Sequence, residues 1–372
     1  MIPLSEPTFG GNEAVYLEQC LVGGYVSSVG PFVDSFERQF AAWVGSHHAV
    51  ACASGTAALH VALQIAGAAP GRLVAVSDFT FIASVNAVHY TGADLLLVDS
   101  EPRTWNMNTE LLRDRVVRRA ARGHRLPDLV EIVHVLGHPA DIEPLLELRE
   151  RFGIRIIEDA AESLGASWHD GRLAGTVGDL ACFSFNGNKI ITTGSGGMIT
   201  TNDATYAARA KHLTTQAKVP ASSYLHDEVG YNYRLSNLSA ALGIAQLEQL
   251  ADRIGRKRQI ALRYAEQLEG LPLTLPPHAT WANPTYWLYS VLLDEAAPEN
   301  VVARLSSAKV EARRVWRPVH LQPPYATAER LLGSVAEAIH ARGLSLPSSS
   351  HLTAEQQRRV SAELGSALAV QN

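Results

Sequence analysis

Short apolar runs rich in β-branched residues alternate with helix-like segments along the first half of the chain. The runs predicted as strands are 47–54, 73–77, 95–99, 129–135 and 155–159, and the segments between them include predicted helices at 55–67, 81–92 and 141–153. Continuous apolar runs of this length, bounded by turn residues, are typical of strands buried within a sheet. The alternation therefore predicts an α/β domain in which helices flank a mostly parallel central sheet.

The pattern changes after about residue 234. Residues 235–271 read as one long helical stretch, and a strand at 286–294 and further amphipathic helices follow it. The chain has 372 residues, of which 47% are hydrophobic, and this is ample for two domains. We expect a large domain over residues 1–249 and a smaller C-terminal α+β domain over 250–372, and we allow the N-terminal segment to pack with the small domain.

Charge and composition argue against several classes of protein. The net charge is -5, and the basic stretches 113–125 and 253–263 are predicted to be solvated helix faces, so no nucleic-acid partner is expected. Polar residues interrupt the apolar runs, so no membrane span is expected, and the first residues lack the features of a signal peptide. The three cysteines match no disulfide or metal spacing (Cys20, Cys52, Cys182). These features predict a cytoplasmic protein.

One lysine stands in an unusual setting. Lys189 is one of five lysines in the chain and lies in "SFNGNKIITTGSGG", among small uncharged neighbours after the predicted strand "LACFSF". Loss of hydration favours the neutral form of a lysine, and a neutral amine can form a Schiff base with a carbonyl group. The alternative is a buried lysine in a structural ion pair.

A second candidate lies where the strand at 47–54 meets the following helix. Ser54, Gly55 and Thr56 form the turn there, in "CASGTAAL". The first amides of a helix and its dipole attract anions, and a glycine lets the backbone come close to a ligand. The turn therefore suggests a phosphate site, although Ser54 could equally be an ordinary helix N-cap.

The third candidate is Asp159, at the carboxyl end of the strand 155–159. Open α/β sheets bind ligands at this edge, and a buried carboxylate there needs a partner such as a protonated ring nitrogen. A helix cap is the alternative reading of Asp159. A phosphate anchor, a partner for a pyridinium and a Schiff-base lysine are together what a protein contributes to pyridoxal 5′-phosphate (PLP) chemistry.

Several longer motifs resemble the DegT/DnrJ/StrS group of PLP-dependent sugar aminotransferases. They include "ASGTAALHVAL", "FTFIASVNAV", "IEDAAESLGA", "SFNGNKIITTGSGGMI" and "GYNYRLSNLSAALG", and the resemblance runs nearly end to end. It implies the PLP-dependent transferase fold type I, with Lys189 joined to the cofactor and Asp159 facing its pyridine nitrogen. It also implies four residues around the phosphate (Ser54, Gly55, Thr56, Ser184).

The same resemblance implies roles for five further residues. Phe81 would stack on the cofactor ring, with core packing as its alternative, and Glu162 would lie near the 3′-oxygen. Asn232 would cross a homodimer interface to the partner's phosphate, so that the two active sites are shared. Arg234 would steady that loop or bind a substrate anion. His320 would lie on a substrate-side loop, with a surface histidine as the alternative.

The presence of Lys189, where some members of the group have histidine and perform dehydration, favours transamination. L-glutamate is the expected donor, and the expected acceptor is a UDP-linked 4-keto-6-deoxy-N-acetylhexosamine used for surface glycans. The alternatives are a GDP-linked sugar as in perosamine synthesis, a keto-inositol, or a PLP-bound regulatory protein without turnover. His134 and His138 are four residues apart, but Gly137 and Pro139 interrupt the helix that a zinc pair would need, so no metal is expected.

Overall fold

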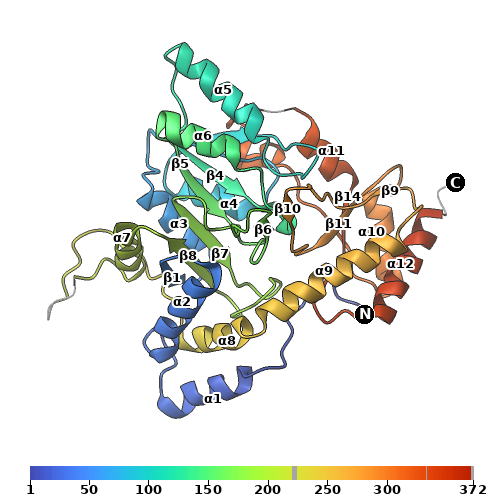
Figure 1. The fold of residues 1–372 in the computed structure, drawn as a ribbon, viewed down its shortest axis with the longest axis horizontal. Coiled ribbons are helices and arrows are strands. Elements are labelled where there is room, and N and C mark those ends of the chain that lie inside the picture. Colours follow the sequence, from blue (N-terminus) through green and yellow to red (C-terminus); the bar gives the residue numbers. More distant parts are fainter. Residues whose placement is uncertain (220–223, 332, 370–372) are drawn as a thin grey trace.

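A sheet of eight strands forms the centre of the computed structural model, which describes residues 1–219, 224–331 and 333–369 (Figure 1). Its order is β1 (His48–Cys52), β8 (Gly197–Thr201), β7 (Leu180–Ser184), β5 (Arg155–Asp159), β4 (Leu129–Val133), β2 (Leu73–Ser77), β3 (Asp94–Val98) and β13 (Glu329–Leu331). The pairs from β7 to β13 are parallel, and β8 is antiparallel to both of its neighbours. The predicted mostly parallel sheet is therefore confirmed.

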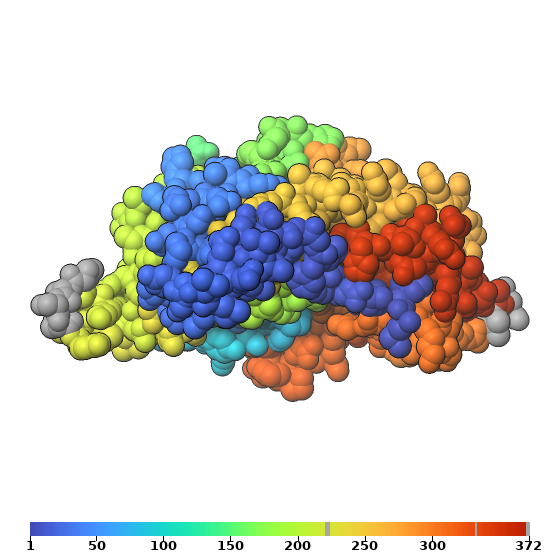
Figure 2. All heavy atoms as spheres, turned by 90° about the horizontal axis from the view of Figure 1, so that it is seen from below, coloured from blue at the N-terminus to red at the C-terminus, as the bar shows by residue number. Residues whose placement is uncertain are grey.

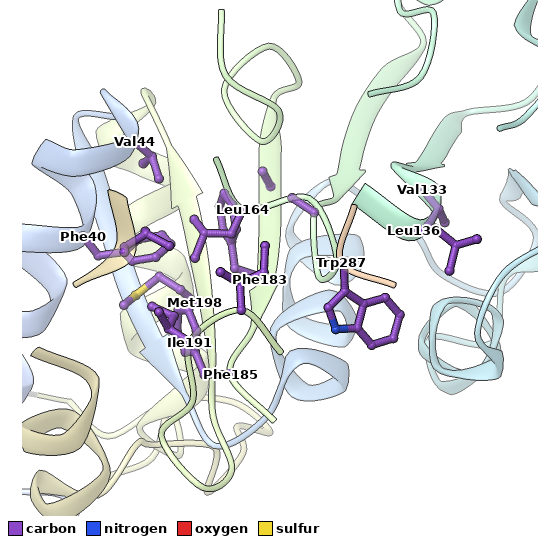
Figure 3. Packing of buried hydrophobic residues seen from close by; sticks show 14 of the residues in the cluster. Phe40, Val44, Val133, Leu136, Leu164, Phe183, Phe185, Ile191, Met198 and Trp287 are labelled. Carbon is purple, nitrogen blue, oxygen red and sulfur yellow. The ribbon is translucent and has the colours of Figure 1, made fainter. Parts of the chain in front are cut away.

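Helices cover both faces of this sheet, because the side chains of each strand alternate between them. On β7, Cys182 packs in the cluster that includes α3 (Gly55–Ile65), whereas Phe183 packs in the cluster that includes α2 (Pro31–Val44). Figure 3 shows Phe40 of α2 facing Phe183 and Phe185, and its ring lies 5.0 Å from that of Phe183. The other helices of this part are α1 (Glu13–Gly23), α4 (Ile82–Tyr90), α5 (Thr109–Ala121), α6 (Glu143–Phe152), α7 (Ala204–Thr214) and α8 (Asn237–Leu247).

A second sheet lies in the C-terminal part and has four strands, in the order β12 (Arg313–Arg314), β14 (Gly343–Leu346), β11 (Tyr289–Leu293) and β9 (Leu273–Thr274). It shares a separate apolar cluster with α9 (Leu250–Gln267), α10 (Pro298–Ser307) and α12 (Ala354–Ala369). The remaining regular elements include α11 (Val335–Arg342) and the two-stranded pair β6 (Ser167–Trp168) and β10 (Ala282–Asn283).

The N-terminal segment packs against this C-terminal part. Ile2 pairs with the chain at Lys309 and Glu311 through backbone hydrogen bonds, and Figure 2 shows N-terminal and C-terminal residues side by side on one face. In the other direction, β13 leaves the C-terminal part and pairs with β3 of the large sheet. We still propose a division into domains near residue 249. The pairing of Ile2 with the C-terminal part and the pairing of β13 with β3 would connect the two domains.

Two expectations about residues 235–271 are wrong. The stretch is two helices, since α8 ends at Leu247, α9 begins at Leu250, and Gln249 between them has a non-helical backbone. The basic residues of α9 are only partly solvated, because Arg253 and Lys257 are each only 3% exposed, whereas Arg256 is exposed as expected. They lie four residues apart and therefore on one side of α9, which crosses between the two parts of the structure and is covered on that side (Figure 1).

The other basic stretch behaves as expected. On and after α5, three arginines form surface ion pairs with acidic residues (Arg113 with Glu110, Arg119 with Glu329, Arg125 with Asp94).

The three cysteines are buried and free. Within the described ranges, none of the helices has both the length and the apolar character that crossing a membrane requires.

Candidate active site

A cavity of about 360 Å³ lies where the carboxyl ends of β5 and β7 meet the N-terminus of α3. Ligands of open α/β sheets bind at this edge, because the loops that leave neighbouring parallel strands diverge there. The cavity brings together most of the residues that the sequence singled out (Ser54, Gly55, Thr56, Phe81, Asp159, Glu162, Ser184, Lys189).

Lys189 lies in the turn that follows β7, and its side chain is 12% exposed. Its Nζ atom is 3.5 Å from Oε1 of Glu162 and 3.8 Å from the ring centroid of Trp287. The neighbours of Lys189 along the sequence are uncharged, but its neighbours in space include a carboxylate and an aromatic face. The ion pair that we regarded as the alternative is therefore present within the cavity itself.

Glu162 is the nearest acidic partner of that amine. Its other oxygen, Oε2, accepts a 2.9 Å hydrogen bond from the backbone amide of Leu136. Burial raises the pKa of Glu162 to about 7, against the opposing effects of Lys189 and of this hydrogen bond. Near neutral pH the carboxyl group can therefore take up or release a proton next to Lys189.

Asp159 is 4% exposed at the end of β5. Its Oδ2 accepts a 2.8 Å hydrogen bond from the Ser84 hydroxyl, and its Oδ1 accepts one of 3.1 Å from the amide of Ala161. Burial raises the pKa of Asp159, and the Ser84 hydrogen bond opposes that rise. Residues 161–165 form turns rather than a helix, which disfavours the helix-cap reading. A cationic ring nitrogen at this carboxylate would offset the cost of its burial.

The N-terminus of α3 fits an anion. Ser54 is indeed the N-cap, because its Oγ accepts a 3.1 Å hydrogen bond from the amide of Ala57, and its O–H remains able to donate. The amides of Gly55 and Thr56 have no acceptor within the helix. A Cβ atom on Gly55 would lie 2.8 Å from Cβ of Ser184, so glycine is required for α3 to approach β7 this closely. The geometry therefore suits the phosphate of PLP.

Phe81 lies just before α4 and lines the cavity with 54% of its surface exposed. Core packing, the alternative that the sequence left open, is excluded by this exposure. The ring is available to cover a flat ligand, which is the arrangement expected for a cofactor ring.

Three residues that the sequence singled out lie outside this cavity, namely Asn232, Arg234 and His320. Asn232 is exposed and pairs through its backbone with Thr215, which leaves its side chain on the surface. Arg234 lines a separate cavity of about 220 Å³.

His320 requires a correction. It is buried, with Nδ1 2.7 Å from Oδ2 of Asp78 and Nε2 3.2 Å from Oε1 of Glu337, so it is not a surface histidine. It does not reach the cavity either, because the buried carboxylate of Asp78 holds both its ring and its backbone amide.

The two histidines considered for a metal have structural partners. His134 accepts a hydrogen bond from the amide of Ala140 through Nδ1, so its Nε2–H donates to Glu158 at 2.8 Å. His138 donates from Nδ1 to the carbonyl of Pro139, and burial lowers its pKa to about 4.

Sequence reasoning missed much of the cavity wall. Ser84 lies within the motif "FTFIASVNAV", but nothing in its local sequence indicates a contact with Asp159. The opposite wall comes from the C-terminal part and lies about a hundred residues or more from Lys189 in sequence (Trp287, Arg313, Arg314, Trp316, Ser345). No local pattern marks these residues, because their place depends on how the second sheet packs against the first.

Comparison with known proteins agrees with this geometry. Residues 7–365 match the model of the DegT/DnrJ/EryC1/StrS aminotransferase family. EpsN of Bacillus subtilis, which carries the provisional description of a pyridoxal phosphate-dependent aminotransferase, is 41% identical over 96% of this chain and 94% of its own. GDP-perosamine synthase of Caulobacter vibrioides is 39% identical over 99% and 98%. The crystal structure of a DegT DnrJ EryC1 StrS aminotransferase from Brucella abortus superposes with a TM-score of 0.90, at 28% identity, over 96% and 95%.

Proposed function

The chain belongs to the DegT/DnrJ/EryC1/StrS aminotransferase family and is a PLP-dependent sugar aminotransferase, and we propose that it moves an amino group from L-glutamate to the 4-keto carbon of a nucleotide-linked 4-keto-6-deoxy sugar for surface glycans. The observation that carries this proposal is the placement of Lys189 and Asp159 in one cavity with the N-terminus of α3. These three features match the aldehyde, the ring nitrogen and the phosphate of PLP.

PLP, when bound, accepts the electron pair released from the carbon that bears the amino group. The residues of the protein supply the binding groups and the proton transfers. Lys189 would hold the aldehyde and, when free of it, would move a proton at the reacting carbon, while Asp159 would keep a proton on the ring nitrogen. Ser54, Gly55 and Thr56 would bind the phosphate, and Phe81 would cover one face of the ring.

The nucleotide is the finer part of the proposal. The sequence motifs favoured a UDP-linked sugar, whereas a relative covering almost the whole chain is named GDP-perosamine synthase. We therefore place the GDP-linked 4-keto-6-deoxymannose first. Arg313 and Arg314 line the cavity, each paired with a glutamate (Glu311 and Glu299), and the remaining N–H groups of their guanidinium groups suit a diphosphate.

The test separates the two half-reactions. Glutamate is added to the PLP-loaded protein until the visible absorption of the bound cofactor disappears, and the excess is removed. GDP-linked and UDP-linked 4-keto-6-deoxy sugars and a keto-inositol are then added separately. The GDP-linked sugar should restore the absorption most rapidly. Restoration by 2-oxoglutarate but by no sugar would contradict the proposal, and Lys189→Ala serves as the inactive control.

We further propose that the enzyme is a homodimer with shared sites. Asn232 is exposed outside the cavity of its own chain, as a residue reaching into a partner's site would be. Apolar residues are exposed at the end of α4 and on α1, including Tyr90 at 55%, Leu21 at 66% and Val22 at 84%. Apolar exposure of this extent is typical of a surface that a second copy covers.

A further inference from the structure

Trp287 contacts Lys189 and the residue before it. The centroid of its ring lies 3.8 Å from Nζ of Lys189, so the indole face covers the amine. Its Nε1–H donates a 2.7 Å hydrogen bond to the carbonyl of Asn188, the residue immediately before Lys189. One side chain therefore contacts both the charged end of Lys189 and the backbone from which Lys189 extends.

The position of Trp287 is determined by close backbone packing. A Cβ atom on Gly137, whose φ is +92°, would lie 2.8 Å from the backbone nitrogen of Trp287, and Gly137 accepts a 2.9 Å hydrogen bond from the amide of Thr285. The residue before Gly137, Leu136, donates its amide to Glu162. Figure 3 shows Trp287 in one view with Leu136, and both line the cavity.

These contacts form a continuous series that begins and ends at the amine of Lys189. Lys189 pairs with Glu162, Glu162 is held by Leu136, the next residue packs against the backbone of Trp287, and Trp287 returns to Lys189. Trp287 is 4% exposed and stacks on Trp316 at an interplanar angle of 16°, so it has little freedom to turn away. A cation at the face of an indole is the strongest pairing of its type.

We propose that Trp287 is a positioning residue that holds the released ε-amine of Lys189 against Glu162 between covalent steps. The proposal rests on the proposed function, since it concerns the same lysine. Without the indole, the amine remains attached to the chain but samples positions away from Glu162 and from the reacting carbon. A free lysine side chain has many rotamers, and fixing it beforehand removes that entropic cost from the reaction.

The first test observes the contact without any turnover. The ε-methylene signals of the five lysines are recorded by NMR on isotopically labelled full-length protein freed of cofactor, and Lys189→Met identifies the signal of Lys189. The indole should shift this signal upfield relative to exposed Lys309, and Trp287→Leu should abolish the shift. An unshifted Lys189 signal in the wild-type protein overturns the proposal, whatever the activity of the enzyme.

The second test measures the half-reaction with glutamate under saturation. Trp287→Leu should slow it about tenfold with little change in the affinity for PLP, and Trp287→Phe should recover part of the loss, because a phenyl ring can also form a cation–π contact, though a weaker one. An unchanged rate in Trp287→Leu overturns the positioning role. A wild-type protein that shows the NMR shift but does not react with glutamate contradicts the proposed function instead.

A matched pair of glycine variants distinguishes the displacement of Trp287 from a general loss of structure. Gly137→Ala displaces Trp287 without altering it and should reduce both the NMR shift and the rate. Gly153→Ala imposes similar backbone strain, with φ of +69° and open space around the new methyl group, and should change neither. Equal effects of the two variants would show that strain rather than the position of Trp287 controls the rate, and the proposal would be wrong. Circular dichroism confirms that each variant is folded.

Discussion

The hydroxyl of Ser84 donates a 2.8 Å hydrogen bond to Oδ2 of Asp159, and the two residues are 1% and 4% exposed. Ser84 lies in the first turns of α4, and Asp159 ends β5, so the bond joins a helix on one face of the sheet to the strand end in the cavity. A buried carboxylate that accepts hydrogen bonds keeps its negative charge more readily than one that accepts none. Ser84 thus supports the negative charge of Asp159, which our proposal assigns to the ring nitrogen of the cofactor.

Ser84→Ala should raise the pKa of Asp159 further and slow the glutamate half-reaction about tenfold, since a hydrogen bond to a charged group contributes roughly 1.5–3 kcal/mol. The acidic limb of the rate profile should move to higher pH, because the carboxylate is protonated sooner as pH falls. Asp159→Asn should lose about 10²–10³-fold. Ser77→Ala removes a buried hydroxyl that has no hydrogen-bond partner, and it is the matched control. Equal rates for the two serine variants would contradict the role of Ser84.

Borohydride reduction of the PLP-loaded protein should attach the cofactor to Lys189, as seen by peptide mapping. Lys257 is the competing residue, because burial lowers its pKa to about 7 and leaves a more nucleophilic amine. It does not line the cavity, since its Nζ donates to the carbonyls of Trp287 and Ser348. A label on the peptide containing Lys257 would refute the assignment.

Glu162→Gln should remove a titration from the rate profile. In the wild-type enzyme, the glutamate half-reaction should rise as pH increases through about 7, because the ionised Glu162 can accept the proton of Lys189. The variant should lack this rise and be slower by about tenfold or more at pH 8. Glu131→Gln is the control, since Glu131 is a second buried carboxyl group, with its pKa raised by burial, that does not line the cavity. A rise near pH 7 that survives in Glu162→Gln would assign the titration to another group.

Lys257 should make the stability of the protein depend on pH. Its pKa is about 7 in the folded protein and 10.5 in its ordinary state, so the unfolded chain binds more protons between these values. Stability should therefore increase with pH over this window, by an amount on the order of 2 kcal/mol from pH 7 to 9. Urea unfolding of the wild type and of Lys257→Met should show the increase only in the wild type. If the free energy of unfolding changed with pH in the same way in both proteins, Lys257 would keep its charge when buried.

Mixing two inactive variants tests the shared site. Lys189→Ala and Asn232→Ala are unfolded together and refolded in equal amounts, so that random pairing gives about half heterodimers, each with one intact site. Activity should recover to roughly a quarter of wild type. Asn232→Ala must be clearly impaired alone, and differential tags show whether heterodimers form. If they form and activity stays at the sum of the parents, Asn232 serves the site of its own chain.

Elements with local signals could be predicted from the sequence alone. The strand and helix pattern from residue 47 to 159 and the turn at Ser54 follow from residue periodicity and capping, which act over a few neighbours. Lys189 and Asp159 could be selected because each follows a buried strand, and parallel strands carry their carboxyl ends to one edge. The cavity between them was therefore predictable without coordinates.

The side chains that surround Lys189 are set by tertiary packing. Trp287 is almost a hundred residues from Lys189 in the chain, and its place on the amine depends on the packing of its segment against Gly137. Tertiary packing also buries Lys257, which the sequence placed on a solvated helix face, and His320, for which the sequence left a substrate-side loop and a surface position open. Burial of a polar group is decided by the partners that the assembled layers provide, and here these are the carbonyls around Lys257 and the carboxylate beside His320.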